Sequence, residues 1–522
     1  MRIKLVCLVV GFVVTGGAYA ASKAANKNEP WVSEDASGRL VYRTLPRGDR
    51  IVDFSYAGYM GGGVPIPPRL HIGRTVAPSG GDDSATIQKA IDEVSAMPLK
   101  DRFRGAVVLK PGTFQCSVTL KIAASGVVLH GAGPTDGGSI LKLTGEPHGA
   151  IAIAGKQEVT VVGAPTHIAE PYVPSGALTI TVEDGSAFAA GDTIRITRNT
   201  TDAWLHFMGM DKMIRDGKAE TWVGPRIATL RAVKARKGNE LTLDVPLTDS
   251  YDRAYLQPEG AEVAKVMVTG DLEQDAVEGL HIIAPARTVS LDDPLFGVME
   301  MSGLRDGWVR DLLVDDTTNG IDMTSDAARI TIENVVFRHT AAVTSPAKPA
   351  DFGLRGTQIL VYKCGSSGNN LFYAWTGARN QGPNVVLDSE FHGDGRIQAH
   401  QRWSTGLLVD NTRVPQGGID MKNRGEMGTG HGWAMGWGVV WNSSAASLVI
   451  QNPPGAANWS IGTTGDEQRE AMKIIGVRDV DAGPGLPQGL IESPNHRVLP
   501  ESLYRAQLVE RLGAGALKAL EP

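Results

Sequence analysis

Short apolar segments that each end in a polar corner recur along the second half of this 522-residue chain. They read GWVRDLLVDD, ITIENVVFRH, ILVYKCGSSG, NVVLDSEFHG, GLLVDNTRVP and GVVWNSSAAS. Aligned on Asp311, Asn334, Lys363, Ser389, Asn411 and Asn442, they are spaced by 23, 29, 26, 22 and 31 residues. A coil of about 22 residues with loops of variable length is typical of a parallel β-helix. The chain is therefore predicted to be an all-β solenoid in which each coil contributes three short strands.

Composition agrees with this architecture. The 63 glycines and 29 prolines, with aromatic residues at 6%, indicate many short strands and tight turns rather than helices. A solenoid grows by adding coils, so one domain can use most of a chain this long. The motif NGIDM at 319–323 returns as GGIDM at 417–421, which supports the repeat.

The chain divides into five predicted parts. The segment DDSATIQKAID has apolar residues Ile87, Ile91 and Val94 at helical spacing and predicts an N-terminal capping helix. A stretch with the pattern of antiparallel hairpins predicts an inserted small β domain. The expected boundaries are 1–20 for a signal peptide, 21–162 for the lead-in, cap helix and first coils, 163–265 for the insertion, 266–495 for the main β-helix with its active-site loops, and 496–522 for a C-terminal capping helix that covers the last coil.

Two regions resemble a known family. DDSATIQKAID followed by GAVVLKPGTF and SGVVLHGAG resembles the N-terminal coils of the pectate-lyase superfamily of right-handed parallel β-helices. The blocks TGARNQGPNV, HQRWSTG, NRG, TGHGW and NPPGAANW, between Trp375 and Gly465, resemble a group of secreted pectate-lyase-like proteins. The resemblance implies a right-handed β-helix and a secreted polysaccharide-lyase-like protein involved in carbohydrate metabolism.

The N-terminus predicts export. Arg2 and Lys4 precede an apolar run, and Ala18-Tyr19-Ala20 forms a small-residue cleavage site, so the mature protein is expected to be secreted or periplasmic without a membrane anchor. Losing these two positive charges changes the formal net charge from -6 to -8. That acidity argues against nucleic acid and anionic membranes as partners. Cys116 and Cys364 remain and could form a disulfide.

The candidate functional residues cluster between His392 and Trp459, where tryptophans, histidines and basic residues lie close together. Flat rings and guanidinium groups suit an acidic polysaccharide, because rings stack on sugar faces and arginines bind carboxylates. The expected catalytic residues are His400, Arg402, Lys422, Arg424 and His431. The expected substrate-binding residues are His339, Tyr373, Arg379, Trp403, Trp433, Asn458 and Trp459. The alternative is structural: buried tryptophans, histidines bonded to carbonyls, and arginines paired with Asp410 or Glu426.

β-Elimination from a uronic acid is the preferred chemistry. It needs a cation to neutralise the carboxylate, a base for the C5 proton and an acid for the leaving oxygen. Arg402, Arg424 and Arg379 are the candidate neutralisers. His400, His431 or Lys422 could be the base, and Tyr373 or a histidine the acid, an assignment that the sequence leaves open.

Two other functions remain open. TTNGIDMTSDAARITIENVVF resembles the catalytic region of polygalacturonases, although Asn319 replaces one of that family's aspartates. A glycoside hydrolase would need a carboxylate pair from Asp322, Asp326, Asp394 and Glu426. A non-catalytic glycan-binding protein is the third reading. No zinc spacing is present, but Asp292-Asp293 and Asp315-Asp316 could hold calcium.

Overall fold

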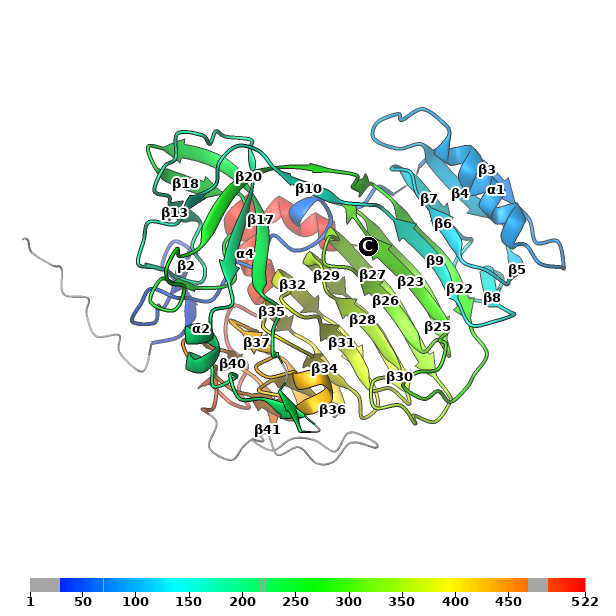
Figure 1. Ribbon diagram of the computed structural model, residues 1–522. Helices are drawn as coiled ribbons and strands as arrows, with labels where there is room; N and C mark the ends of the chain where they lie inside the picture. The colour runs from blue at the N-terminus through cyan, green and yellow to red at the C-terminus, as the bar shows by residue number, and fades with distance from the viewer. Residues whose placement is uncertain (1–28, 69, 216, 220, 468–486, 522) are drawn as a thin grey trace, which may run out of the picture.

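The computed structural model describes residues 29–68, 70–215, 217–219, 221–467 and 487–521, so the expected signal peptide lies outside the described residues. Its centre is a continuous sheet of 29 strands with parallel pairings that winds into a β-helix (Figure 1). Parallel strands joined by crossovers wind right-handed. The predicted all-β, right-handed parallel β-helix is therefore confirmed. Within the described ranges, no helix has both the length and the apolarity to cross a membrane.

Each coil contributes to three parallel sheets, here called sheets A, B and C. Sheet A comprises β3 (Ile72–Val76), β4 (Gly105–Leu109), β7 (Val127–His130), β22 (Ala276–Ile283), β25 (Trp308–Asp315), β27 (Ala328–His339), β29 (Thr357–Tyr362), β32 (Gln381–Leu387), β35 (Ser404–Asp410), β38 (Val439–Trp441), β40 (Trp459–Ile461) and β42 (Leu490–Glu492). Sheet B comprises the later halves of β22, β25 and β27 with β5 (Gly112–Cys116), β8 (Ser139–Leu143), β30 (Gly365–Gly368), β33 (Glu390–Phe391), β41 (Thr464–Glu467) and the first residues of β36 (Arg413–Met421) and β39 (Ser444–Ile450). Sheet C comprises β6 (Leu120–Ile122), β9 (Gly149–Ala154), β23 (Gly297–Ser302), β26 (Asn319–Met323), β28 (Ala350–Leu354), β31 (Phe372–Thr376), β34 (Arg396–Ala399) and the ends of β36 and β39.

The repeat seen in the sequence is the corner between sheets A and B. The corner residue of each coil has a left-handed backbone, with φ of 55° at Asp311, 52° at Asn334 and 50° at Asn411. Asparagine and aspartate tolerate this conformation better than other side chains. The alignment is wrong by one residue in one coil, because Asp388 (φ 47°) and not Ser389 occupies the corner. Asn334 donates to Asp311 at 2.6 Å and Asn411 to Asp388 at 2.7 Å, so neighbouring corners are bonded into ladders.

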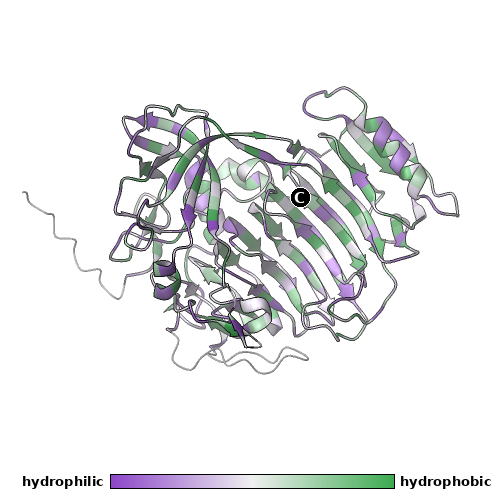
Figure 2. Ribbon diagram, viewed as in Figure 1, coloured by the Kyte–Doolittle hydropathy of each residue, from purple (hydrophilic) through white to green (hydrophobic). Residues whose placement is uncertain are grey.

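The core fills the inside of the coils and is closed at its N-terminal end by α1 (Ser84–Ser95). Ile87, Ile91 and Val94 of α1 are at most 1% exposed within it, which confirms the predicted capping helix. Figure 2 shows hydrophobic and hydrophilic residues alternating along many of the strands. Cys116 and Cys364 are both buried and free, so the disulfide that the sequence allowed is not formed.

The inserted domain leaves the β-helix after β9 and returns to it before β22. Its antiparallel sheet has the order β10 (Glu158–Val161), β20 (Glu262–Thr269), β14 (Thr193–Asn199), β17 (Arg226–Lys237), β18 (Glu240–Leu243) and β13 (Thr179–Thr181), with β11 (Thr166–His167) paired to β20. The sheet therefore extends over 158–269, beyond both of the expected limits, 163 and 265. In Figure 1 it lies at the opposite end of the molecule from α1.

The C-terminal helix does not cover the last coil, contrary to the prediction. The helix α4 (Leu503–Leu512) and the 3-10 helix η2 (Ala514–Leu520) pack against the outer side of sheet A. Residues 31–57, here called the N-terminal segment, pack beside them. Tyr504 donates its hydroxyl to the carbonyl of Ala57 at 2.7 Å, which connects α4 to the segment 51–57. α4 packs on sheet A because the outward residues of this sheet, such as Leu360 and Leu408, are apolar and are stabilised when they are covered.

The remaining described elements are short. They are β1 (Val32–Glu34), β2 (Leu40–Tyr42), the 3-10 helix η1 (Tyr59–Gly61), β12 (Tyr172–Val173), α2 (Asp202–Phe207), β15 (Ile214–Arg215), β16 (Lys218–Ala219), β19 (Tyr251–Asp252), β21 (Leu272–Glu273), β24 (Leu304–Arg305), α3 (Met427–Gly430) and β37 (Met435–Gly436).

Candidate functional site on the outer face of sheet C

A polar row crosses the outer face of sheet C. In register on successive strands lie Glu300, Asp322, Gly353, Trp375, Gln398 and Asp420. Their chain neighbours Ile321, Phe352 and Ile397 point into the core, so the row itself faces outward. The repeated GIDM motif thus places Asp322 and Asp420 at the same position of two coils, and it was the sequence signal for this row.

Asp322 and Trp375 meet above Gly353. Arg355 binds the Asp322 carboxylate with two hydrogen bonds of 2.9 and 2.7 Å, and the half-buried Trp375 ring lies 5.8 Å from the Arg355 guanidinium. A Cβ atom at Gly353 would lie 2.4 Å from Asp322 Oδ1 and 2.9 Å from the Trp375 ring. Glycine is therefore needed for the two side chains to lean together across its strand.

Lys348 adds a second cation beside this carboxylate. Its ammonium group donates to the side chain of Asn319. Burial lowers the pKa of Lys348, while the Asp322 carboxylate opposes that change. Burial raises the pKa of Asp322, and the Arg355 guanidinium opposes it. A lysine with a lowered pKa that is still partly exposed is suited to accept a proton.

Beside Trp375, two residues after Gln398 of the row, His400 is bound by Arg424. Arg424 donates to His400 Nδ1 at 2.9 Å and to its carbonyl at 2.5 Å, and the rings of His400 and His431 lie 4.9 Å apart. Burial, followed by the charge of Arg424, lowers the pKa of His400 well below its usual value. Burial also lowers the pKa of Arg424 to about 10, so its guanidinium stays charged at neutral pH.

This geometry corrects the role expected for His400. Its Nδ1 accepts a hydrogen from Arg424, so the neutral ring carries its proton on Nε2. The ring is then a hydrogen-bond donor and not a base. His431 is 8% exposed beside it, and its carbonyl accepts from the Trp222 indole at 3.0 Å. Arg402 donates to the Thr429 carbonyl at 2.6 Å, and its backbone N–H donates to the His431 carbonyl at 3.1 Å.

Lys422 belongs to a buried ionic cluster and is not placed to act as a base. Asp420 accepts from Arg396 at 2.5 Å and from Gln398 at 2.7 Å, with the Lys422 ammonium at 4.0 Å. All four side chains are at most 3% exposed. Burial disfavours the charge on Asp420, but Arg396 and Lys422 outweigh that effect and lower its pKa to about 2. The Lys422 ammonium is therefore enclosed beside a carboxylate that Arg396 already binds, which fits a structural role.

The three expected tryptophan platforms are instead buried. Trp403 and Trp433 are each 2% exposed and bind the inserted domain, with indole hydrogen bonds to Asp249 at 2.9 Å and to the Met208 carbonyl at 3.1 Å. Trp459 is fully buried against Trp31 on the outer side of sheet A. Their large apolar rings stabilise contacts between distant parts of the chain, so they cannot stack on a sugar.

The other expected substrate contacts lie away from this row or below the surface. Tyr373 is buried and accepts from the Gly395 N–H at 3.1 Å, and Asn458 is buried with its side chain bonded to three backbone groups. His339 is buried 2.8 Å from Asp351. Arg379 is exposed and reaches the Arg226 carbonyl of the inserted domain at 3.4 Å. The structure therefore brings together His400, Arg424, His431 and the backbone of Arg402.

The residues that the sequence analysis missed are Lys348, Arg355 and Trp375. Of the expected hydrolase carboxylates, Asp322 joins them, whereas Asp394 and Glu426 are exposed in separate turns. Asp326 lines a different cleft. Arg355 could have been found from the coil register, because it lies two residues beyond Gly353, directly after the end of β28.

The aspartate pairs considered for calcium have protein partners. Asp315 accepts from Arg338 at 2.6 Å and lies 2.8 Å from His281, and Asp316 accepts from the Thr340 hydroxyl at 2.9 Å. Asp293 accepts from the Ser290 N–H at 2.6 Å. Across the described residues, no group of three or more histidine, cysteine, aspartate or glutamate side chains could hold a metal ion. A calcium requirement stays a prediction.

No protein-family model matches the chain, and no curated protein does. Solved structures with some similarity include a tailspike of Acinetobacter baumannii bacteriophage AP22 in complex with capsular saccharide (13% identity, TM-score 0.27, 74% of this chain and 67% of that one). Another is a polygalacturonase from Erwinia carotovora (11%, 0.31, 80% and 98%). A third is a tailspike from Pseudomonas phage phi297 (11%, 0.28, 79% and 73%). Likeness at this level carries no argument about family or reaction, so membership of the pectate-lyase superfamily stays a prediction.

Proposed function

We propose that the protein is an exported carbohydrate-active enzyme that cleaves an acidic polysaccharide by β-elimination on the outer face of sheet C. The observation that carries this proposal is a group of cations at Trp375 and its neighbour His400, in a chain whose net charge is -6. Arg355 lies 5.8 Å from the half-buried Trp375 ring, which is 5.9 Å from the His400 ring. Arg424 donates to His400, and the charge of Lys348 also acts on this histidine. An acidic protein that concentrates cations beside an aromatic ring is suited to a sugar that carries carboxylates.

Each group has a role in the proposed reaction. The Trp375 ring stacks on the sugar, and Arg355 neutralises the uronic carboxylate, which acidifies the C5 proton. Lys348 takes that proton, the electron pair forms the C4–C5 double bond, and the C4–oxygen bond breaks. The Lys348 ammonium then returns the proton to the leaving oxygen. His400 donates from Nε2 to the carboxylate as negative charge develops on it.

The test is the ultraviolet absorbance of the unsaturated uronide while purified protein is incubated with polysaccharides of galacturonate, mannuronate, guluronate and glucuronate. Lys348→Ala should abolish the absorbance rise, whereas Lys363→Ala, at an exposed corner of the same solenoid, should not change it. A flat trace with every substrate, accompanied by new reducing ends, would sink the elimination reaction. Loss of the signal with a calcium chelator would move the neutralising role from Arg355 to a metal ion.

Glycoside hydrolysis is the second candidate, favoured by Glu300 and Asp322. These carboxylates face outward at paired positions of neighbouring strands, which lie about 4.8 Å apart. Burial raises the pKa of Asp322 although Arg355 and Lys348 oppose it, and the Glu300 charge adds a smaller rise; a raised carboxyl pKa suits a general acid. Glu300→Gln should abolish reducing-end release if the enzyme is a hydrolase and leave uronide formation largely unchanged if it is a lyase.

Export is proposed from residues 1–20. Expression of the full chain should yield a mature protein in the periplasm or medium whose N-terminal residue, found by Edman sequencing, is Ala21. An uncleaved N-terminus on a cytoplasmic protein would contradict this.

A further inference from the structure

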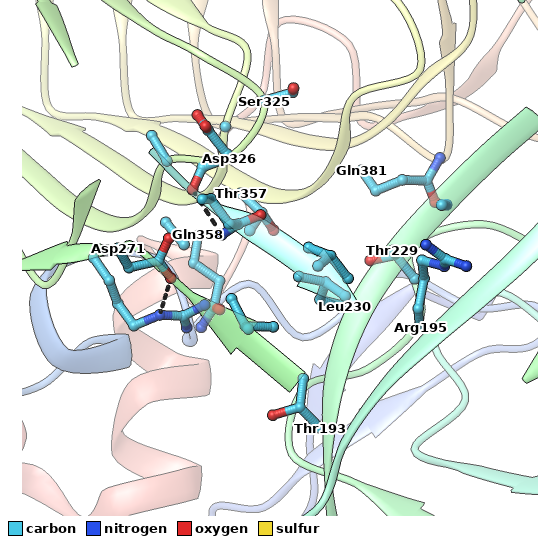
Figure 3. Close-up of a pocket in the computed structure, with 18 of the residues that line it drawn as sticks. Thr193, Arg195, Thr229, Leu230, Asp271, Ser325, Asp326, Thr357, Gln358 and Gln381 are labelled. Atoms are coloured by element: carbon cyan, nitrogen blue, oxygen red, sulfur yellow. Dashed lines mark hydrogen bonds and ion pairs between the residues drawn. The ribbon is translucent and has the colours of Figure 1, made fainter. Parts of the chain in front are cut away.

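A hollow lies between the inserted domain and the β-helix, with a volume of about 560 Å³ (Figure 3). Its floor is the corner between sheets C and A in three successive coils, at residues 325–328, 355–358 and 379–381. Its roof is the inserted sheet, where Thr193 and Arg195 of β14 lie opposite Ala232 and Leu230 of β17. The volume falls in the range of small-molecule sites.

Two buried hydrogen-bond donors of this cleft have no acceptor among the residues that the structure describes. Within the described part of the chain, the side chain of Arg195 makes no ion pair or hydrogen bond, and its Nε is buried. Gln381 is 6% exposed, and its Nε2 has no hydrogen-bond partner among those same residues. By contrast, Arg231 donates to the carbonyls of Val245 and Pro246 at 3.1 Å, which marks it as structural. Buried donors without acceptors are costly, so the unpaired ones indicate a ligand that carries acceptors.

The cleft is connected to the sheet C site through Arg355. This side chain lines the cleft and also binds Asp322 of the polar row. Arg379, on the next coil, also lines the cleft, and the one hydrogen bond of its guanidinium to a described residue is the 3.4 Å contact with the Arg226 carbonyl. Leu230 and Ala232 offer an apolar surface beside these cations.

We propose that this cleft is a binding site for a short acidic saccharide, the part of the polysaccharide that lies beside the bond being cleaved. Arg195 and Arg379 bind its carboxylates, Gln381 donates to a hydroxyl, and the apolar face of a sugar ring packs on Leu230. This inference rests on the proposed function, because it gives the same substrate a second point of attachment. Binding energy from such a non-reacting part holds the substrate in place for the reaction.

The test is isothermal titration calorimetry of the full chain carrying Lys348→Ala, with tetrasaccharides of galacturonate, mannuronate and guluronate and with neutral maltotetraose as control. At least one acidic tetrasaccharide should bind and maltotetraose should not. Adding Arg195→Ala should weaken that binding about tenfold or more, because it removes a charge-assisted hydrogen bond. The matched control is Arg236→Ala, on β17 outside the cleft, where Arg236 donates to the Gly238 carbonyl. The proposal would be overturned if Arg195→Ala and Arg236→Ala bound the acidic tetrasaccharide equally well, or if no acidic tetrasaccharide bound.

Kinetics distinguish this proposal from the proposed function. If both hold, Arg195→Ala in the otherwise unchanged enzyme raises KM and changes kcat little. A protein that cleaves uronic polysaccharides with a KM unaffected by Arg195→Ala refutes the cleft alone. A protein that binds acidic tetrasaccharides in an Arg195-dependent way and never cleaves any substrate refutes the elimination reaction and retains the cleft.

Discussion

Sheets A and C are built from the same coils, yet their outer faces differ completely. Outside sheet A, Leu360, Tyr362 and Trp441 are buried beneath the N-terminal segment and α4. Outside sheet C, the row that contains Asp322 and Trp375 is polar and partly exposed. The coil determines only which residues face outward. The role of an outward face depends on what covers it. The same residue type, tryptophan, is buried and stabilising outside sheet A (Trp441) and partly exposed outside sheet C (Trp375).

The largest expected effect is on the covered sheet. Trp441 is fully buried and donates to the Pro500 carbonyl at 2.9 Å. Trp441→Ala should lower the free energy of unfolding by about 3–5 kcal/mol, because it leaves a large cavity under α4. Urea unfolding measures this, and the specific activity of the folded fraction should be unchanged. A loss below about 1 kcal/mol would mean that the cover of sheet A contributes little.

Two buried aspartates, one on each sheet, are expected to make the free energy of unfolding depend on pH in opposite directions. Asp410 on sheet A accepts from the Tyr504 N–H at 2.8 Å, and burial raises its pKa to about 7. Its unfolded pKa is about 4, so its contribution to stability is complete below about pH 4 and is lost as pH rises through 7. Asp420 on sheet C has a pKa of about 2, so its contribution is present above about pH 4 and is lost as pH falls through 2.

The expected outcome is a stability that falls between pH 4 and 7 by on the order of 4 kcal/mol through Asp410 alone. Asp410→Asn keeps the acceptor oxygen and should remove this slope, as urea midpoints across that range would reveal. If wild type and variant change in parallel with pH, Asp410 does not titrate as the geometry implies.

A smaller effect is expected at Gly353. Gly353→Ala places a Cβ against Asp322 and Trp375 and should cost about 1–3 kcal/mol of unfolding free energy, together with a fall in kcat/KM on uronic polysaccharides. Gly149→Ala on the same sheet is the matched control, since its Cβ would meet no atom within 4 Å. Similar behaviour of the two variants would show that the arrangement above Gly353 is unimportant.

The smallest stability effect is expected at Trp375, the half-buried tryptophan of sheet C. Trp375→Ala should change the free energy of unfolding by about 1 kcal/mol or less, while KM for the polysaccharide rises about tenfold. Thermal unfolding and initial rates measure the two quantities. A stability loss as large as that of Trp441→Ala, with KM unchanged, would reverse the contrast between the two sheets.

The sequence alone determined the solenoid. Asn334, Asn411 and Asp311 mark left-handed corners, and such corners are local properties of the chain, as is the periodicity of α1. It also placed Asp322 in the coil register through the GIDM repeat. It could not separate the roles of the tryptophans, because Trp459 is buried by Trp31, which lies more than 400 residues away in the sequence.

Only the tertiary structure decided which cations face solvent and which are buried. Lys422 is buried 4.0 Å from Asp420, whereas Lys348 is partly exposed and acts on Asp322, although it comes from a proline-flanked loop with no motif. The tautomer and the lowered pKa of His400 likewise depend on Arg424 of the next coil. Burial and charge pairing are sums over neighbours brought together by folding, and the spacing of residues along the chain does not contain them.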